Sequence, residues 1–167
     1  MKLWIAQGFG AGRIPFAPGT FGSLLGLGWF ALLLCGRSWL VFGAGAAGGI
    51  GVSIWLCGAG EKRLNQKDPG SVVLDEVAAM PLCFAAAMAV AGWQQKQWAG
   101  PEYFFSAAHG VQTAGIFALF RFFDILKPWP VRQSQRLPGW LGITLDDVLA
   151  AVYVNLVVWG ISGLAGR

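Results

Sequence analysis

The sequence predicts an all-α, polytopic bundle of helices embedded in a membrane. The chain has 167 residues, of which 56% are hydrophobic and only 12% are charged. Its mean hydropathy of +0.58 and its long apolar runs exceed what a water-soluble domain needs, and they are typical of a protein with several membrane spans. Nine tryptophans fit aromatic anchoring at the two membrane surfaces.

Five apolar segments supply the helices of this bundle, about four to five in number. They cover residues 21–36, 38–59, 76–93, 104–123 and 147–165. The third opens at an acidic pair, the fourth ends at an arginine, and a second acidic pair opens the fifth. Because a membrane helix needs about 20 apolar residues, the second, fourth and fifth are long enough, whereas the first and third are marginal.

The second segment carries Gly43, Ala47 and Gly51 at a spacing of four residues. Small residues at that spacing let two helices approach closely in lipid, so we expect this helix to pack centrally. General enrichment of small residues in a bundle explains the pattern equally well.

Lysine and arginine are distributed unevenly between the connections of the bundle. If the N-terminus is cytoplasmic, the basic residues on the inner side are Lys2, Arg13, Lys62, Arg63, Lys67, Lys127, Arg132 and Arg136. Only Arg37, Lys96 and Arg167 fall outside. This asymmetry agrees with the excess of positive charge in cytoplasmic loops and gathers the polar motifs at the cytoplasmic face.

Other bulk features narrow the class of protein. The net charge of +4 without a dense basic tract suits an anionic membrane surface or substrate, and no nucleic acid is expected as a partner. The first ten residues lack the apolar run of a cleavable signal peptide. The three cysteines, Cys35, Cys57 and Cys83, lie far apart in apolar segments, so we expect small buried side chains without disulfides.

Five of the eight carboxylates lie in three short polar stretches, as Asp75-Glu76, Asp124 and Asp146-Asp147. A carboxylate beside a membrane or a core costs free energy unless it is paired, hydrogen-bonded or bound to metal. Carboxylates from several elements offer the oxygen ligands that Mg²⁺ prefers, so all five are candidate metal ligands. Taken singly, either pair is also explained by helix N-terminal capping.

Residues 17–23, Ala-Pro-Gly-Thr-Phe-Gly-Ser, predict a tight turn that leads into a helix. Thr20 or Ser23 can cap that helix, and free N–H groups at its start can bind an anion such as phosphate. Thr20, Gly22 and Ser23 are therefore candidate phosphate contacts, although capping without a ligand also accounts for them.

Residues 120–130 form the most distinctive stretch of the chain. Arg121, Asp124 and Lys127 follow one another at intervals of three, so on a helix their side chains share a face, and Pro128 ends that helix. A cation beside a metal site can hold phosphate oxygens, which makes Arg121 and Lys127, with Arg13, candidates for binding phosphate. Basic side chains that reach for the membrane surface from a helix end are the alternative.

His109 is the single histidine and lies near the face opposite the acids, where we expect a structural role. Catalysis by histidine is then improbable, and the chemistry falls to metal and carboxylate. The catalytic candidates are Asp75, Asp124, Asp147 and Lys127.

Four motifs resemble those of the phosphatidylglycerophosphatase A family, in the same order and over nearly the whole chain. They are Phe-Gly-x-Gly-x-x-Pro-x-Ala-Pro-Gly-Thr-x-Gly-Ser at 9–23, Leu-Asp-Glu-Val at 74–77, Phe-Arg-x-Phe-Asp-x-x-Lys-Pro-Trp-Pro at 120–130 and Gly-Ile-x-Leu-Asp-Asp-Val-x-Ala at 142–150. The third motif is highly specific.

The resemblance implies a Mg²⁺-dependent lipid phosphatase of the bacterial inner membrane, a multi-pass protein formed by a single domain over residues 1–167. It implies hydrolysis of the terminal phosphomonoester of phosphatidylglycerophosphate, which gives phosphatidylglycerol and inorganic phosphate in phospholipid biosynthesis. Asp124 is then a metal ligand, a base or a nucleophile.

Two other classes of protein are alternatives to this lipid phosphatase. A small membrane transporter of cations or lipids could use the acidic cluster, but it predicts acids near mid-span and inverted repeats, which this sequence does not display. A CDP-alcohol phosphotransferase is also a Mg²⁺ enzyme of lipid headgroups, but its repeated Asp-Gly pattern is missing.

Overall fold

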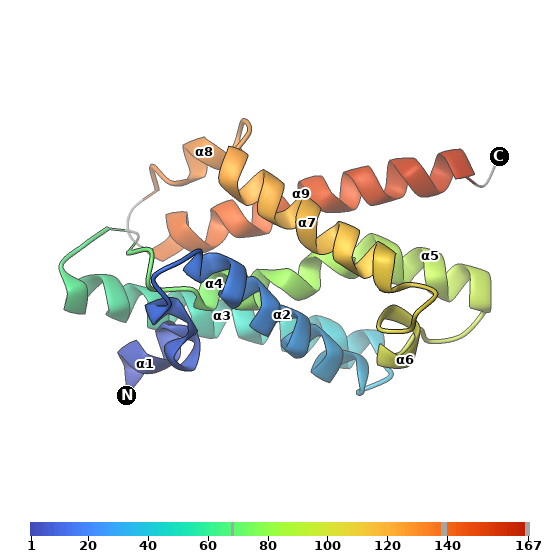
Figure 1. Ribbon diagram of the computed structural model, residues 1–167, viewed down its shortest axis with the longest axis horizontal. Coiled ribbons are helices and arrows are strands. Elements are labelled where there is room, and N and C mark those ends of the chain that lie inside the picture. Colours follow the sequence, from blue (N-terminus) through green and yellow to red (C-terminus); the bar gives the residue numbers. More distant parts are fainter. Residues whose placement is uncertain (68, 138–139, 166–167) are drawn as a thin grey trace.

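The computed structural model describes residues 1–67, 69–137 and 140–165, and the regular elements in these ranges are all helical (Figure 1). The α-helices are α1 (Lys2–Ala6), α2 (Pro18–Leu34), α3 (Trp39–Leu64), α4 (Leu74–Ala79), α5 (Ala85–Gln95), α6 (Pro101–Phe104), α7 (Gly110–Leu126), α8 (Val131–Ser134) and α9 (Trp140–Ala165). Two 3-10 helices are η1 (Gly8–Arg13) and η2 (Met80–Phe84). The prediction of an all-α bundle is confirmed.

The long helices lie side by side along the longest axis of the molecule (Figure 1). One end holds α1 and α8, the last turns of α3 and α7, and the first turns of α2, α4 and α9; we refer to it as the α8 end (Figure 1). The opposite end, the α6 end, holds α6 and the last turns of α5 and α9. All four predicted motifs therefore have their polar residues near the α8 end.

Three helical segments are long and apolar enough to cross a membrane: α3, the run Leu74–Gln95 and α9. The third predicted segment, marginal in sequence, thus reaches a spanning length, while α2 is a shorter apolar helix. The fourth predicted segment is not among these three, so its role as a membrane span stays a prediction. Its helix α7 begins only at Gly110, after a turn in which Ser106 Oγ accepts the His109 N–H at 3.3 Å, and it has 17 residues.

The run Leu74–Gln95 is broken at Pro81, because proline lacks the N–H that an α-helix needs, and α4 passes through η2 into α5. Asn155 of α9 hydrogen-bonds to the broken turn. Its Oδ1 accepts the Ala86 N–H at 2.7 Å, and its Nδ2 donates to Leu82 O at 2.8 Å. One side chain thus ties the break to the neighbouring helix.

The main apolar core lies between α2, η2, α5, α7 and α9, away from the polar motifs. Phe30 of α2 stacks on Phe84 of η2 with ring centroids 4.0 Å apart, and Phe104 packs edge-on against both rings. The half of the bundle toward the α6 end is therefore filled by rings and aliphatic side chains.

The small-residue stripe of α3 does not pack centrally, so that prediction is wrong. Gly43, Ala47 and Gly51 are exposed, and a Cβ atom on either glycine would meet nothing within 4 Å. The inward face of α3 consists instead of residues such as Phe42, Ala46 and Leu56.

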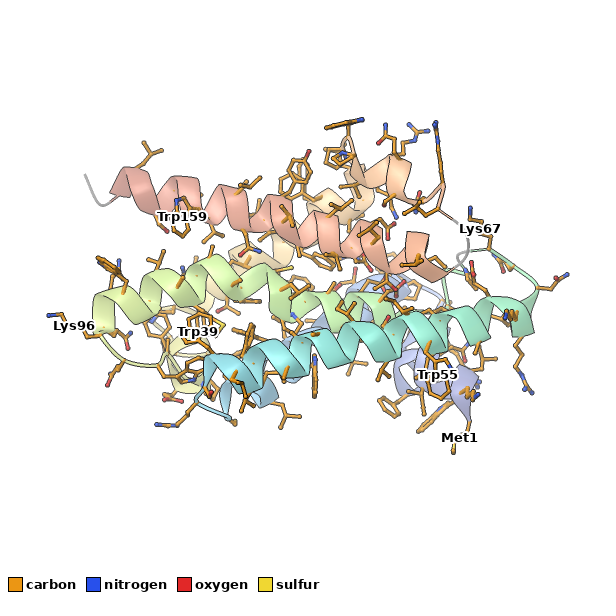
Figure 2. All side chains as sticks on the ribbon, turned by 180° about the vertical axis from the view of Figure 1, so that it is seen from behind. Met1, Trp39, Trp55, Lys67, Lys96 and Trp159 are labelled. Atoms are coloured by element: carbon orange, nitrogen blue, oxygen red, sulfur yellow. The ribbon has the colours of Figure 1, made fainter. Side chains whose placement is uncertain are left out.

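Charged and aromatic side chains mark both ends of the bundle. Lys67 lies at the α8 end and Lys96 at the α6 end, with Trp55 and Trp39 toward the same respective ends (Figure 2). The two exposed tryptophans are sixteen residues apart on α3, which corresponds to about 24 Å of helix and suits two aromatic belts. Arg167, assigned to the outer side, lies outside the described residues.

Candidate functional site

A small polar cavity opens between α4, α7 and α9 at the α8 end. Its volume is about 260 Å³. The side chains that line it include all five predicted acids and one cation: Asp75, Glu76, Asp124, Asp146, Asp147 and Lys127. The carboxylates that are scattered over 73 residues of sequence thus share one cavity.

The two acidic pairs line the cavity from different positions along their helices. Asp75 and Glu76 lie in the first turn of α4, where the helix dipole favours acids, but neither caps its N-terminus. Asp146 and Asp147 do not open the fifth helix as expected, because α9 begins at Trp140. Their place well inside α9 excludes helix capping as the reason for this pair.

Three of the acids form a group that could hold a metal ion. Oxygen atoms of Asp75, Glu76 and Asp147 all lie within 4.8 Å of one another, and Asp75 and Asp147 are buried. Among the described side chains, Glu76 Oε2 is one of the few buried polar atoms without a hydrogen-bond partner. A buried, unpartnered carboxylate oxygen costs free energy that a cation would offset, so the donor set fits a divalent metal that prefers oxygen ligands.

The other two acids hold cations in place. Arg121 Nη1 donates to Asp124 Oδ2 at 2.6 Å and lies 3.9 Å from Glu76 Oε1. Lys127 Nζ donates to Asp146 Oδ2 and lies 3.9 Å from Asp124 Oδ1. Asp124 and Asp146 are therefore committed to ion pairs at the edge of the metal group, and their predicted role as ligands stays a prediction.

Lys127 ends α7 in a left-handed conformation with φ 47°, which turns the chain toward α8. Burial by itself lowers the pKa of Lys127, but the hydrogen bond to Asp146 and the charges of the neighbouring carboxylates outweigh it and raise the pKa above its ordinary value. The ammonium group therefore stays protonated at neutral pH.

The start of α2 closes the same site from a fourth side. Ser23 Oγ donates to Gly19 O at 2.9 Å and accepts from Arg121 Nη1 at 3.4 Å. A Cβ atom on Gly19 would lie 3.0 Å from Arg121 Nη1 and would also meet the Glu76 carboxylate. Glycine is needed there because the arginine and the acid occupy the space of a side chain.

Three further predicted phosphate contacts have surroundings that differ from those of Ser23. Arg13 is exposed and donates to Gln7 Oε1 at 2.9 Å, outside the acidic cavity. Gly22 packs against Val73, whose Cβ would lie 2.8 Å from a Cβ atom on this glycine. Thr20 does not cap α2, whose N-cap is Ala17 with no side-chain hydrogen bond; the N–H of Thr20 is bonded to Ala17 O at 2.9 Å. Their contacts with phosphate stay predictions.

Gln135 belongs to the site but was missed in the sequence. Its Nε2 donates to Asp146 Oδ2 at 2.9 Å, so Asp146 is held by both Gln135 and Lys127. The residue follows α8 in a polar connection, where a glutamine carries no distinguishing pattern. His109, as expected, is far from the acids: its Nδ1 lies 3.2 Å from Ser106 Oγ, and its ring stacks on Tyr103.

The rim of the cavity is apolar where it meets the outer surface of the bundle. Ile125 lines the cavity and is 72% exposed, and Leu126, Trp129 and Phe9 are also largely exposed near the same end. Exposed apolar side chains of this kind are compatible with a site that borders the lipid of a membrane.

An apolar helical bundle with buried carboxylates beside an arginine and a lysine has the groups that binding a phosphate ester together with a metal ion requires. The sequence model of the family described as "Phosphatidylglycerophosphatase A" matches residues 4–162. The chain belongs to this family. Family membership confirms the predicted enzyme class, a phosphoric monoester hydrolase, and does not favour a transporter.

Several bacterial proteins are similar to this chain over most of its length. A phosphatidylglycerophosphatase A of Haemophilus influenzae is 38% identical over 161 residues, which cover 94% of this chain and 86% of the relative. The Escherichia coli protein of the same name is 33% identical over 149 residues, 89% of this chain and 76% of the relative. A Bacteroides thetaiotaomicron protein, provisionally named a phosphatidylinositol-3-phosphatase, is 36% identical over 167 residues, 95% of this chain and 91% of the relative. No solved structure matches the chain.

Proposed function

We propose that this protein is a Mg²⁺-dependent phosphatase that removes the terminal phosphate of phosphatidylglycerophosphate, giving phosphatidylglycerol for phospholipid biosynthesis. The observation that carries the proposal is the group of Asp75, Glu76 and Asp147, with an unpartnered Glu76 oxygen, next to Arg121 and Lys127. The names of the relatives supply the substrate.

The charge of the cavity supports the need for a metal. Five carboxylates face only two cations, Arg121 and Lys127, which leaves a formal charge of −3 when all are ionised. A phosphate monoester adds about −1.5 to −2 at neutral pH and would be repelled. We propose Mg²⁺ as the neutralising ion because every donor is a carboxylate oxygen, and when bound it supplies Lewis-acid polarisation of a phosphate oxygen.

The protein's own cations hold the phosphate. Lys127 lines the cavity and donates to Asp146, which Gln135 also holds. Arg121 lies beside the cavity, where it donates to Asp124 and Ser23 and is 3.9 Å from Glu76 Oε1. Such preorganised donors stabilise charge that develops on phosphate oxygens without having to reorganise during the reaction. Arg13 is too exposed for us to include it.

We propose that Asp124 orients the attacking water and accepts its proton. Its Oδ2 is engaged by Arg121, whereas its Oδ1 lies 3.9 Å from Lys127 Nζ, beyond hydrogen-bond distance, and can accept from water. The water oxygen bonds to phosphorus as the bond from phosphorus to the glycerol oxygen breaks, and the departing glycerol oxygen takes up a proton from solvent water and leaves as the lipid alcohol. A phosphate group trapped covalently on Asp124 would replace this role by that of a nucleophile.

We further propose a bacterial inner-membrane protein with the α8 end in the cytoplasm. The nine lysines and arginines near that end, Arg121 included, against Arg37 and Lys96 at the other, support this orientation. The whole chain, 1–167, acts as one membrane-embedded domain in this proposal, because α2, α4, α7 and α9 all contribute side chains to the site.

The test is phosphate release by the purified full chain in phosphatidylcholine liposomes that contain phosphatidylglycerophosphate. We expect release with Mg²⁺, loss of release in EDTA and recovery when Mg²⁺ is returned. Phosphatidate and phosphatidylinositol 3-phosphate, the latter suggested by the name of the Bacteroides relative, serve as competing substrates. Full activity in excess EDTA would overturn the metal, and preference for either competitor would overturn the substrate.

Variants separate the site from the rest of the fold. We expect Asp75→Asn and Asp147→Asn to lose turnover and to bind Mn²⁺, followed by electron paramagnetic resonance, more weakly than the wild type. Glu102→Gln is the matched control, because Glu102 is an exposed acid at the α6 end that pairs only loosely with Arg37 at 3.4 Å. Wild-type turnover in Asp147→Asn would remove that residue from the mechanism.

A further inference from the structure

The five carboxylates of the acidic cavity fall into two sets according to the partners of their oxygens. The first set is the metal group, in which oxygens of Asp75, Glu76 and Asp147 lie within 4.8 Å of one another and Glu76 Oε2 is buried without a hydrogen-bond partner. The second set is Asp124 and Asp146, and neither belongs to a group of three such oxygens within the described part of the chain. Both sets line one cavity of about 260 Å³, so the partners of the second set bear on how many metal ions fit.

The carboxylate of Asp146 is surrounded by N–H donors. Its Oδ2 accepts from Lys127 Nζ and from Gln135 Nε2, the latter at 2.9 Å, and its Oδ1 accepts the Asp147 N–H at 3.1 Å. An ionised carboxylate has about four lone-pair sites, so most of those on Asp146 are directed at donor hydrogens. Because a hydrogen and a metal ion cannot share one lone pair, Asp146 in this arrangement is a hydrogen-bond acceptor.

Lys127 places its ammonium group between the two carboxylates of the second set. Nζ donates to Asp146 Oδ2 and lies 3.9 Å from Asp124 Oδ1. The other oxygen of Asp124, Oδ2, accepts from Arg121 Nη1 at 2.6 Å. A cation that links carboxylates of two helices, α7 and α9, has the position that a divalent ion takes in a carboxylate site. The ammonium group differs in carrying a single charge and in being held by the hydrogen bonds that it donates.

Two-metal sites for phosphoryl transfer hold their ions roughly 3.5–4 Å apart, where the ions clamp the attacking and leaving oxygens. Here the lysine adjoins the metal group, because Asp146, which holds Lys127, precedes Asp147 in α9 and all three line the cavity. We propose that this site takes one divalent ion, at the metal group, and that the Lys127 ammonium group occupies the place of a second ion. The inference rests on the proposed function and adds the number of ions and the role of the lysine.

Glycine at position 127 removes the ammonium group without straining the backbone. Lys127 has φ 47°, in the left-handed region that glycine adopts at little cost. Lys127→Gly should therefore keep the end of α7 and open a space bordered by Asp124 Oδ1 and Asp146 Oδ2. Lys96→Gly is the matched control, because Lys96 also ends a helix with a positive φ, 55°, but is exposed at the opposite end of the bundle (Figure 2).

The measurement is the number of Mn²⁺ ions bound per chain, counted by electron paramagnetic resonance of the full chain in detergent micelles. We expect one ion in the wild type and in Lys96→Gly, and two spin-coupled ions in Lys127→Gly. Adding Asp146→Asn to Lys127→Gly should return the count to one. Two coupled ions in the wild type, or a single ion in folded Lys127→Gly, would overturn the proposal.

A second comparison keeps Lys127 and so does not depend on the folding of the glycine variant. Asp146→Asn and Asp147→Asn change neighbouring acids of α9, but only the second removes a ligand of the proposed ion. We expect Asp147→Asn to weaken Mn²⁺ binding about tenfold more than Asp146→Asn does. Equal weakening by the two variants would place Asp146 among the ligands and overturn the proposal.

Phosphate release separates this inference from the proposed function. One bound ion in a protein that releases no phosphate from phosphatidylglycerophosphate would uphold the count and overturn the function. Release by a wild-type enzyme that holds two coupled ions would uphold the function and overturn the role given to Lys127.

Discussion

Replacing Asn155 by leucine is expected to destabilise the bundle and to displace the acidic site. Leucine keeps the branching and the number of heavy atoms of the side chain but cannot accept the Ala86 N–H or donate to Leu82 O. Both backbone groups lie at the break beside Pro81, where the helix itself does not satisfy them. The break connects α4, which carries Asp75, to the rest of the run, so its loss loosens α4 against α9.

The magnitude follows from two interhelical hydrogen bonds of 2.7 and 2.8 Å. In membrane proteins such bonds contribute about 0.6 kcal/mol on average and at most about 1.7 kcal/mol each. The loss in the free energy of unfolding is therefore about 1–3 kcal/mol. A third bond, from Asn155 Nδ2 to Ala151 O, lies within α9 and adds little, because that carbonyl also serves the helix.

The assay is unfolding by sodium dodecyl sulfate in mixed micelles, followed by far-ultraviolet circular dichroism. Ser162→Ala is the control, since Ser162 lies on the same helix and bonds only to Val158 O; we expect a change within about 0.5 kcal/mol. If Asn155→Leu unfolds at the same detergent fraction as Ser162→Ala, the break is held by packing alone and the reasoning from its hydrogen bonds is refuted.

Three further changes test the site and the orientation. Gly19→Ala should lower kcat/KM about 100-fold, because the new Cβ displaces the guanidinium and the Glu76 carboxylate beside it, while Gly160→Ala, at an exposed position of α9 with open space around it, should not; equal activities would refute the contact. Lys127→Met should lower kcat by about 100-fold or more with the fold retained by circular dichroism, and undiminished turnover would exclude the lysine from phosphate binding. A membrane-impermeant maleimide should label exposed Cys35, and neither buried cysteine, in right-side-out vesicles; labelling only in inside-out vesicles would reverse the proposed orientation.

The sequence was sufficient to predict the helical class and the gathering of five acids from distant segments. Charge asymmetry and apolar length carried that prediction, because both properties are local to each segment. Asp75 and Asp147 are brought together by the packing of α4 on α9, and an approximate topology is enough to place both at the same end.

Contacts between distant elements could not be predicted in the same way. The start of α9 was placed seven residues too late, because the predicted segment began at the acidic pair. In the folded chain Gly142 packs against α8, where a Cβ atom would lie 2.9 Å from Leu137 O and 3.0 Å from Ser134 O. That contact exists only after the chain has turned back, and it explains both the glycine and the depth of Asp146 and Asp147.

The stripe of small residues on α3 misled for a related reason. Spacing reports that one face of a helix is smooth but not which neighbour lies against it. Gly43 and Gly51 face outward, whereas Gly45 and Gly49, which are also four residues apart, face α2: a Cβ atom on Gly49 would lie 3.2 Å from Trp29 Nε1. Tertiary packing decides whether the surface beside a glycine is covered by another helix, by lipid or by neither.

The exposed apolar side chains of Ile125, Leu126 and Trp129 beside the acidic cavity have a consequence for how the proposed enzyme meets its substrate. A site that opens at the level of the lipid is reached by diffusion within the plane of the membrane. The quantity that saturates it is the mole fraction of substrate among the surrounding lipids, and the bulk concentration is irrelevant. Diluting the substrate with inert phospholipid at constant total substrate should slow the reaction, whereas adding buffer at constant membrane composition should leave the rate per enzyme unchanged.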